Sequence, residues 1–483
     1  MIYIMNLNDV LALDGLGQAE LIRSKEITPL ELIDAVIEKI ERLNPKLNAI
    51  VIHMFEIARK TAQKEIPKGP FKGVPFLLKD LVAEYEGTPY TGGSAFLKGY
   101  ISPQDTELVR RYKQAGLITL GKTNSPELGI GSVTQPRLYG PSRNPWDPSK
   151  TSGGSSGGSG SAVAAGFVAI AHGNDGGGSI RIPASCCGVV GLKPTRGRNP
   201  LGPYYGELWG GLAAEHVLTR SVRDSAAMLD VTSGPDIGDP YWAPPVEQSF
   251  SQAIKQSPGR LRIAFTDQTY SGTKIHPDCR SAVRDVAKLC EELGHHVEEA
   301  SPKVNGSFLF EKFTKVLCVV AAGGLRDFTR ITGRQPMKED IEPLAWGLAK
   351  IGEEISAAEY FETVQDLHKL SREVANFHET YDLFLTPTLG LPPVPIGSYL
   401  MKDNDDPIEI RRQMSNFSPF TTLQNVTGQP AISLPLNWNN KGLPIGTQFV
   451  GRFGDEVTLF RIAAQLEEAR PWKDRWPKIS VFS

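Results

Sequence analysis

The pattern of apolar and polar residues predicts alternating helices and strands in the first part of the chain. Apolar residues recur at helical spacing over 30–43, after a capping sequence at 28–31, which predicts a helix that ends near Pro45. A continuous apolar run at 74–78 predicts a buried strand. A charged residue, Lys79, follows this strand directly.

The same alternation returns in the second half of the chain. A strand at 262–265, a helix with an apolar face over 283–293 and a strand through Val297 form a βαβ-like unit. Further strands are predicted near 381–388 and 429–436. No repeat of fixed period, charge block or long linker divides the sequence, so we expect one α/β domain over all 483 residues.

The charge and apolar composition of the chain limits the classes of molecule that it is expected to bind. The chain has 52 Lys and Arg against 54 Asp and Glu, and the resulting net charge of −2 argues against a protein that binds nucleic acid or an anionic membrane through a basic surface. No stretch reaches 18 uninterrupted apolar residues, so no membrane-spanning helix is expected. A small uncharged molecule is the expected partner.

Cysteine use and the N-terminal residues predict a cytoplasmic protein. The five cysteines include no C-x-x-C pair, and no histidine lies at zinc-ligand spacing, which predicts a reducing compartment and no metal site. The apolar run at 1–5 is too short for a signal peptide and lacks a basic stretch.

The segment from Gly116 to Thr123 matches the Walker A pattern of nucleotide-binding P-loops. In a P-loop a glycine-rich turn joins a strand to a following helix. Here the middle residues 117–120 are themselves a predicted strand, and the predicted helix at 105–115 precedes it. We therefore interpret the match as accidental and keep a P-loop nucleotide hydrolase only as a remote alternative.

Glycine is concentrated in one stretch, since 10 of the 48 glycines fall within 153–178. The Gly/Ser tract at 153–160 has the composition of a flexible linker. It runs directly into the apolar segment 162–170, which must be buried. The glycines are therefore expected at the N-terminus of a core helix, where backbone N–H groups face a bound molecule.

Three glycines at 176–178 precede Ser179 and can bring backbone N–H groups close to a substrate oxygen, as an oxyanion hole requires. Ser179 is then a candidate nucleophile, although spacing alone favours a tight turn with a capping serine. The usual base is histidine, but His172 is expected to pack structurally. Lys79 is the best-placed lysine if burial lowers its pKa, and a strand-end lysine reaching into solvent stays the alternative.

Several ordered motifs together resemble the amidase signature family. They extend over nearly the whole chain, from about Asp14 to about Trp472. Ser155 and Ser179 are 24 residues apart, as in that family. The matching segments are 73–80, 121–127, 153–159, 177–183, 187–195, 385–388 and 425–431.

The resemblance implies an amide hydrolase with a Ser–cis-Ser–Lys triad and an acyl-enzyme intermediate. By position, Lys79 is the base, Ser155 is the bridging serine that follows a cis peptide bond, and Ser179 is the nucleophile. The implied oxyanion hole consists of the N–H groups of Gly176, Gly177, Gly178 and Ser179.

Other positions carry supporting roles in the same family pattern. Ser156, Asp175 and Arg181 are expected to support the site structurally, and Gly129 and Ile130 to line the substrate site. Cys318 is expected near the pocket wall, although an apolar core position suits it better. The segments 200–212, 308–325 and 344–351 are expected to shape the pocket.

The implied fold is a single α/β domain with a mixed central sheet flanked by helices on both faces. Its parts are an N-terminal helical segment at about 14–60, the signature core at about 73–200 and a C-terminal completion of the sheet at about 380–472. The resemblance implies no cofactor, a small-molecule amide substrate and a homodimer.

Within the family, the runs 172–175 and 182–188 resemble the branch of 6-aminohexanoate-cyclic-dimer hydrolases, which implies linear or cyclic amides of that type as substrates. Asn174 replaces a commoner Thr and leaves the triad intact. A stretch typical of the A subunit of glutamyl-tRNA(Gln) amidotransferase is missing around 315–320. An amidotransferase subunit and a non-catalytic binding protein on the same scaffold are the alternatives.

Overall fold

The strands form one mixed sheet of 11 strands in a computed structural model that describes residues 7–483. The strand order is β1-β3-β2-β4-β6-β5-β10-β11-β9-β7-β8. β2 pairs in parallel with β3 and β4, and β7 pairs in parallel with β8 and β9, whereas the other pairs are antiparallel. The strands are β1 (Ile50–His53), β2 (Pro75–Lys79), β3 (Ile118–Thr123), β4 (Ile170–Asp175), β5 (Val190–Lys193), β6 (Ala214–Thr219), β7 (Arg262–Phe265), β8 (His296–Glu299), β9 (Leu383–Pro387), β10 (Ala431–Trp438) and β11 (Pro444–Val450).

Helices cover both faces of this sheet, as the alternation of side chains along β2 illustrates. Leu77 packs into a core cluster that also contains residues of α3 and α6, whereas Phe76 and Leu78 pack into a cluster with residues of α5 and α8. Since successive side chains of a strand point to opposite faces, these clusters lie on opposite sides. The α-helices are α1 (Leu7–Ala12), α2 (Gly15–Arg23), α3 (Pro29–Leu47), α4 (Phe55–Ala62), α5 (Glu107–Gln114), α6 (Gly157–Ala164), α7 (Arg181–Cys187), α8 (Val222–Thr232), α9 (Phe250–Ala253), α10 (Pro277–Glu292), α11 (Gly306–Thr332), α12 (Pro343–Glu354), α13 (Ala357–Phe377), α14 (Pro407–Phe417), α15 (Thr422–Thr427) and α16 (Glu456–Ala469), and the 3₁₀ turns are η1 (Ala95–Leu97) and η2 (Glu127–Gly129).

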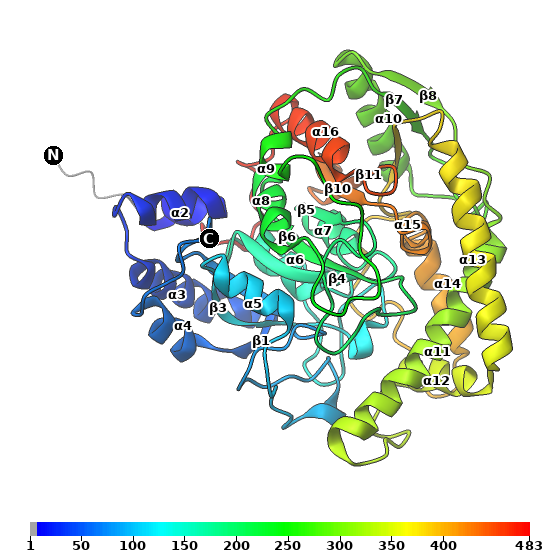
Figure 1. Cartoon of the computed structure of the whole chain (residues 1–483), viewed down its shortest axis with the longest axis horizontal. Helices are drawn as coiled ribbons and strands as arrows, with labels where there is room; N and C mark the ends of the chain where they lie inside the picture. The colour runs from blue at the N-terminus through cyan, green and yellow to red at the C-terminus, as the bar shows by residue number, and fades with distance from the viewer. Residues whose placement is uncertain (1–6) are drawn as a thin grey trace.

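This architecture confirms the predicted α/β domain with a mixed sheet between helices. The βαβ unit is present, because β7 and β8 are parallel and α10 connects them. Figure 1 shows the N-terminal helices α2 to α4 on one side of the sheet region and α11 to α13 on the opposite side of the molecule. The proposed segment boundaries at 14–60, 73–200 and 380–472 stay predictions.

The helix predicted to end near Pro45 is longer than expected. α3 continues through Pro45 to Leu47, and Asn48 closes it in the left-handed conformation with its N–H on the carbonyl oxygen of Asn44 at 2.7 Å. A proline in the last turn removes only one backbone hydrogen bond. Burial of Leu43 and Leu47 on the helix face compensates for that loss.

The glycine tract lies at the N-terminus of a buried helix, as predicted, but this helix begins and ends earlier than expected. The helix α6 begins inside the tract at Gly157, and it ends at Ala164, so the apolar run 162–170 is divided between α6 and the start of β4. All eight residues of α6 are buried. Small residues let this helix lie close to its neighbours: a Cβ atom on Gly158 would lie 2.4 Å from the backbone nitrogen of Asn124.

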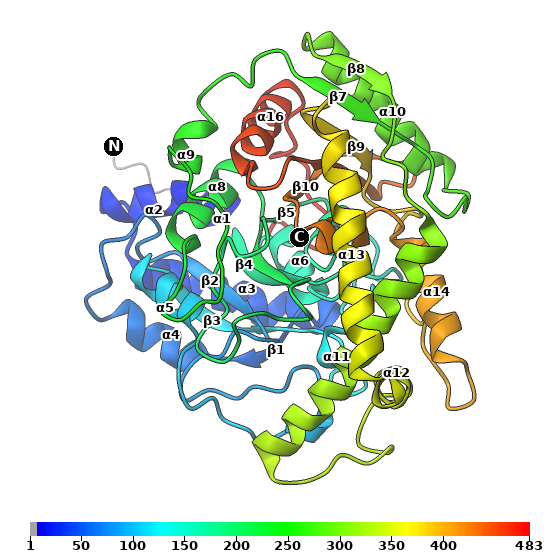
Figure 2. The ribbon, with the colours of Figure 1, turned by 45° about the vertical axis from the view of Figure 1, so that its right-hand side comes forward.

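Helices α11 to α15 form a layer beside the sheet. α11 packs against α12, α13, α14 and α15, and apolar residues of these helices share one core cluster. In Figure 2 the long helix α13 crosses the front of the molecule, with α11 behind and beside it. This layer supplies one wall of the site described below.

No helix among residues 7–483 has an apolar stretch long enough to cross a membrane. The same residues contain no group of three or more His, Cys, Asp or Glu side chains that could hold a metal ion. The prediction about a signal peptide at 1–5 concerns residues outside the described range.

Candidate active site

Two neighbouring strands bring the candidate site together. β2 ends at Lys79, and β4, its parallel neighbour, ends at Asn174 and Asp175. Because parallel strands end at the same edge of a sheet, these side chains meet there. The glycine tract before α6 and the loop after β4 bring Ser155 and Ser179 to the same edge.

Lys79 is fully buried, and its two hydrogen-bond partners are uncharged. Its Nζ atom donates to Ser155 Oγ and to Asn174 Oδ1, both at 2.6 Å. Burial lowers the pKa of Lys79 to about 7, although the nearby carboxylates of Glu215 and Asp175 act in the opposite direction. A large share of the amine is therefore unprotonated near neutral pH and able to accept a proton.

His172 lies beside Lys79 and hydrogen bonds to its backbone. Its Nδ1 atom accepts the backbone N–H of Lys79 at 3.2 Å, and its Nε2 atom is 3.3 Å from Glu215 Oε1. The ring is completely buried, which confirms that this histidine packs structurally. Among the described residues, neither ring nitrogen hydrogen bonds to Ser155 or Ser179.

Ser155 follows a cis peptide bond, Gly154–Ser155, as predicted. The backbone here passes close to another segment, since a Cβ atom on Gly154 would lie 2.5 Å from the nitrogen of Val133. Ser156 joins two parts of the site: its hydroxyl donates to the carbonyl oxygen of Asn174 and its N–H donates to that of Ser179, both at 3.2 Å. Ser156 therefore holds the segments together without contacting Lys79.

The loop 176–179 places a free hydroxyl beside free backbone N–H groups. Within residues 7–483, Ser179 Oγ has no hydrogen-bond partner, and the N–H groups of Gly176, Gly177 and Ser179 have no acceptor. The N–H of Gly178 differs from the prediction, because it donates to Asp175 Oδ1 at 2.7 Å and is directed away from the cavity. Three of the four predicted donors thus stay available.

The loop is closely packed as well as hydrogen bonded. A Cβ atom on Gly176 would lie 2.5 Å from the Trp209 ring, and one on Gly178, whose φ is +129°, would lie 2.4 Å from Thr421 Oγ1. Side chains at these positions would displace the loop, which explains the glycines.

Asp175 and Arg181 form a buried ion pair that stabilises this loop. Both are completely buried, and Arg181 donates to the carboxylate through Nε at 3.0 Å and Nη2 at 2.9 Å. Although burial alone would raise the pKa of Asp175, the Arg181 guanidinium and the Asn425 amide hold it well below its ordinary value. Among the described residues, neither side chain hydrogen bonds to Lys79, Ser155 or the Ser179 hydroxyl, in keeping with a structural role.

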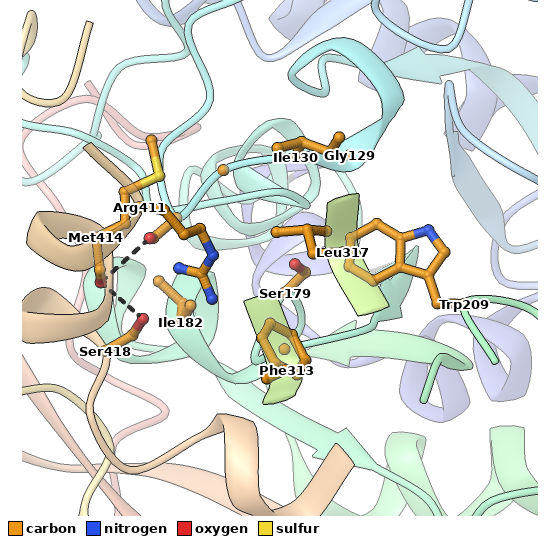
Figure 3. Close-up of a pocket in the computed structure, with 13 residues that line it drawn as sticks. Gly129, Ile130, Ser179, Ile182, Trp209, Phe313, Leu317, Arg411, Met414 and Ser418 are labelled. Atoms are coloured by element: carbon orange, nitrogen blue, oxygen red, sulfur yellow. Dashed lines mark hydrogen bonds between the residues drawn. The ribbon is translucent and has the colours of Figure 1, made fainter. Parts of the chain in front are cut away.

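Ser179 lies between two cavities. The larger cavity, of about 1050 Å³, also contains Ser155 and Asn174 and carries the carboxylates Glu207 and Asp327. The smaller cavity, of about 400 Å³, is lined by Gly129, Ile130, Gly131, Ser132, Gly177, Ser179, Ile182, Trp209, Phe313, Leu317, Arg411, Met414 and Ser418 (Figure 3). Trp209 reaches both cavities.

Gly129 and Ile130 lie where the sequence places them, against the candidate site. Both line the smaller cavity, and a Cβ atom on Gly129 would lie 3.5 Å from Ser155 Oγ. Two of the predicted pocket segments also reach Ser179, through Trp209 at 200–212 and through Phe313 at 308–325. The third, 344–351, does not, since Leu344 lines a separate cavity without Ser179.

Two polar residues of the site were not predicted from the sequence. Asn174 was noted only as a departure from the family pattern, yet its amide oxygen accepts a hydrogen bond from Lys79. Its position at the end of a strand next to β2 is the signal that could have identified it. Arg411 lies in α14, far along the chain, and no sequence motif connects it to Ser179.

The Walker-like segment does not form a P-loop. Its middle residues are β3, and Lys122 lies within that strand with a fully buried side chain. Lys122 Nζ donates to the carbonyl oxygen of Pro89 at 2.6 Å. No loop is available to surround a phosphate, so the match is accidental, as interpreted from the sequence.

Cys318 occupies an apolar core position. It is 1% exposed in α11 and belongs to the cluster shared by α11 to α15. Burial raises the pKa of its thiol to about 11, although Arg411 acts in the opposite direction. The thiol is therefore neutral and lies behind the cavity wall, because Phe313 and Leu317 of the same helix line the smaller cavity instead.

Comparison with known proteins finds relatives that match nearly the whole chain. A family model described as Amidase matches residues 31–460. The chain is 40% identical over 480 residues to a 6-aminohexanoate-cyclic-dimer hydrolase of Paenarthrobacter ureafaciens, with 96% of each chain covered. A solved structure of 6-aminohexanoate cyclic dimer hydrolase superposes with a TM-score of 0.93 at 39% identity, covering 97% of this chain and 99% of that one. A bacterial aryl acylamidase of the amidase signature family superposes with a TM-score of 0.85 at 27% identity, covering 95% and 96%.

Proposed function

The chain belongs to the amidase family and is an amide hydrolase, and from this premise we propose that Lys79, Ser155 and Ser179 carry out the reaction. The observation that carries the proposal is the 2.6 Å hydrogen bond from Lys79 Nζ to Ser155 Oγ at the edge of the cavity that contains Ser179. A buried amine with a pKa of about 7 is a suitable general base at neutral pH.

In the first half of the reaction, Ser179 Oγ attacks the amide carbonyl carbon. Its proton passes to Ser155 Oγ while the Ser155 proton passes to the neutral amine of Lys79, which becomes an ammonium. The carbonyl oxygen takes up the negative charge, and the free N–H groups of Gly176, Gly177 and Ser179 are the donors that would stabilise it.

The intermediate then collapses and the carbon–nitrogen bond breaks. The leaving nitrogen takes a proton from Ser155, which regains one from Lys79, so the amine leaves neutral and an acyl ester stays on Ser179. Water attacks this ester through the same relay, and the carboxylic acid leaves. Each proton that Lys79 accepts is returned, and the enzyme ends unchanged.

For the substrate, we propose small carboxamides, with linear and cyclic amides of the 6-aminohexanoate type as the first compounds to test. The similarity to 6-aminohexanoate-cyclic-dimer hydrolases supports this choice. Two cavities that meet at Ser179 provide room for the two halves of an amide.

The experiment that tests the mechanism is labelling with a fluorophosphonate, which reacts with activated serines. We expect labelling of wild-type protein at Ser179 and none in Ser179→Ala, together with loss of at least about 10³-fold in kcat on any amide that the wild type cleaves. Ordinary turnover by Ser179→Ala would overturn the assignment. A non-catalytic binding protein would not be labelled, and an amidotransferase subunit would need a partner enzyme for its activity.

Cellular location and assembly complete the proposal. We place the protein in the cytoplasm, a location supported by five buried cysteines that are all free thiols in the described chain. We retain the homodimer as a prediction of the family resemblance. Light scattering of the purified protein measures its mass directly, and a monomer at micromolar concentration would contradict that prediction.

A further inference from the structure

The smaller cavity contains one cation without a counter-ion. In Figure 3 the Arg411 guanidinium points into the cavity toward Ser179. Among the described residues Arg411 has no ion pair and no hydrogen bond, and its closest aromatic contact is the Phe313 ring, 5.3 Å from Cζ. Taking a guanidinium out of water without an anion is costly, so such a group commonly awaits one.

Apart from the nucleophile Ser179, the other polar side chains of this cavity already have partners. The hydroxyls of Ser132 and Ser418 donate to the carbonyl oxygen of Met414, at 3.5 Å and 3.1 Å. The rest of the wall is apolar or glycine. Arg411 also remains charged at neutral pH, because burial lowers its pKa only to about 10. Away from the free hydroxyl and N–H groups of the loop 176–179, its five N–H groups are the donors left for a bound molecule, and their planar arrangement suits a carboxylate.

The two cavities differ in which half of an amide they can hold. Ser155, which returns the proton to the leaving nitrogen in the proposed mechanism, lines the larger cavity and is not part of the smaller one. The leaving amine therefore belongs in the larger cavity, and the acyl half belongs in the smaller cavity with Arg411. The carboxylates of Glu207 and Asp327 in the larger cavity disfavour a second anion there.

We propose that Arg411 binds a carboxylate at the far end of the acyl chain, so that preferred substrates are amides of short dicarboxylic acids. This inference rests on the proposed amidase function and ranks amides of dicarboxylic acids above the 6-aminohexanoate type, whose linear form carries its carboxylate on the amine half. Arg411 and Ser179 line the same small cavity, so a short acyl chain suffices to join them.

The test compares two amides that share a leaving group. The mono-4-nitroanilide of glutaric acid has a carboxylate on its acyl chain, and pentanoyl 4-nitroanilide has none. We expect wild-type kcat/KM to be at least about tenfold higher for the first compound, and Arg411→Met to lower that value about 10- to 100-fold, mainly through KM. The loss on the neutral anilide should be at least about tenfold smaller, and Arg411→Lys should recover part of the preference.

A neighbouring residue provides the matched control. Arg412 follows Arg411 in α14 but is exposed and lies 3.5 Å from Glu409. Arg412→Met should leave the ratio between the two anilides unchanged. Equal cleavage of both anilides by wild type, or equal losses on both in Arg411→Met, would overturn the inference, as would a stronger Arg411 dependence for N-butyryl-4-aminobenzoate, whose carboxylate is on the amine half.

A binding measurement separates this inference from the hydrolase mechanism. Calorimetric titration of glutarate into Ser179→Ala needs no turnover, and we expect binding that disappears in the Ser179→Ala/Arg411→Met double variant. If fluorophosphonate labels Ser179 but glutarate does not bind, the carboxylate site is wrong and the hydrolase proposal stands. If glutarate binds through Arg411 but Ser179 is not labelled, the proposed mechanism is wrong and the carboxylate site stands.

Discussion

Lys79 and Lys122 lie on neighbouring parallel strands at the same edge of the sheet, yet their surroundings give them different chemistry. β2 and β3 pair so that Leu78 is opposite Lys122 and Lys79 is opposite Thr123. Both lysine side chains are completely buried. Each follows a motif that could be functional, an amidase-like signature in one strand and a Walker-like pattern in the other.

The difference lies in the groups that meet each amine. Lys79 donates to the hydroxyl of Ser155 and to the amide oxygen of Asn174, and burial lowers its pKa to about 7 although the carboxylates of Glu215 and Asp175 favour its charged form. Lys122 donates to the carbonyl oxygen of Pro89, and although burial lowers its pKa, the carboxylates of Asp80 and Glu84 favour its charged form. Burial alone therefore does not make a lysine a base, since the amine must also lie beside a hydroxyl that can pass it a proton.

The largest expected effect comes from removing the Lys79 amine. Lys79→Ala should lower kcat by at least about 10³-fold, because no group would then accept the Ser179 proton. Activity of the wild type should rise with pH through about 7, as Lys79 loses its proton, and this rise should disappear in the variant. A pH–rate profile measures both. Persistence of the same limb in Lys79→Ala would show that another group is the base.

The Lys122 amine should matter for the stability of the fold and little for catalysis. Lys122→Met leaves the buried Asp80 carboxylate without its nearby cation, and we expect the free energy of unfolding to fall by about 3–5 kcal/mol. Urea denaturation measures this value. The double variant Lys122→Met/Asp80→Asn, which also removes the anion, should recover most of the loss.

The same variant tests the remote nucleotide-binding alternative. Folded Lys122→Met should keep kcat within about threefold of wild type, since Lys122 is not part of the proposed relay. Mg-ATP should not raise the melting temperature of the wild type. A nucleotide-dependent rise that Lys122→Met abolishes would contradict our interpretation of β3.

Giving Lys79 a charged neighbour should make it behave more like Lys122. Asn174→Asp places a carboxylate where an amide oxygen now lies 2.6 Å from Nζ, which stabilises the ammonium and raises the pKa of Lys79. The acid limb of kcat/KM should move to higher pH, so activity at pH 7 should fall about 10- to 100-fold and recover by about pH 9. Asn174→Ala removes the same hydrogen bond without adding charge, and an upward shift in that control would contradict the electrostatic explanation.

The contrast also indicates how far the sequence could predict this site. Lys79, Ser155 and Ser179 are recognisable because each lies in a local motif whose residues are adjacent in the chain. Asn174 and Arg411 are not, because their roles depend on which strand pairs with β2 and on how α14 packs against α11. Tertiary contacts, which no local sequence pattern encodes, bring Asn174 and Arg411 into the site.

Local structure was predictable to a similar extent. The periodic patterns identified α3, α10 and the strands β2 and β7, since long amphipathic and continuous apolar runs are strong signals. Element ends were less accurate where a local signal competed with burial. Pro45 suggested a helix end, but the buried Leu47 extends α3 beyond it, and the glycines at 157–160 form part of α6 because the surrounding backbone leaves room only for small residues.

The smallest effect is expected at Ser156, which contacts the surroundings of Lys79 without contacting the amine. Its hydroxyl donates to the Asn174 carbonyl oxygen, whereas its backbone N–H holds Ser179 and would remain in Ser156→Ala. Loss of one buried hydrogen bond should lower the free energy of unfolding by about 1 kcal/mol and kcat by less than about tenfold, with no change in the position of the acid limb. Urea denaturation and the pH–rate profile measure these quantities. A shift of the limb in Ser156→Ala would mean that the Ser156 hydroxyl, and not the Ser155 and Asn174 oxygens alone, sets the proton affinity of Lys79.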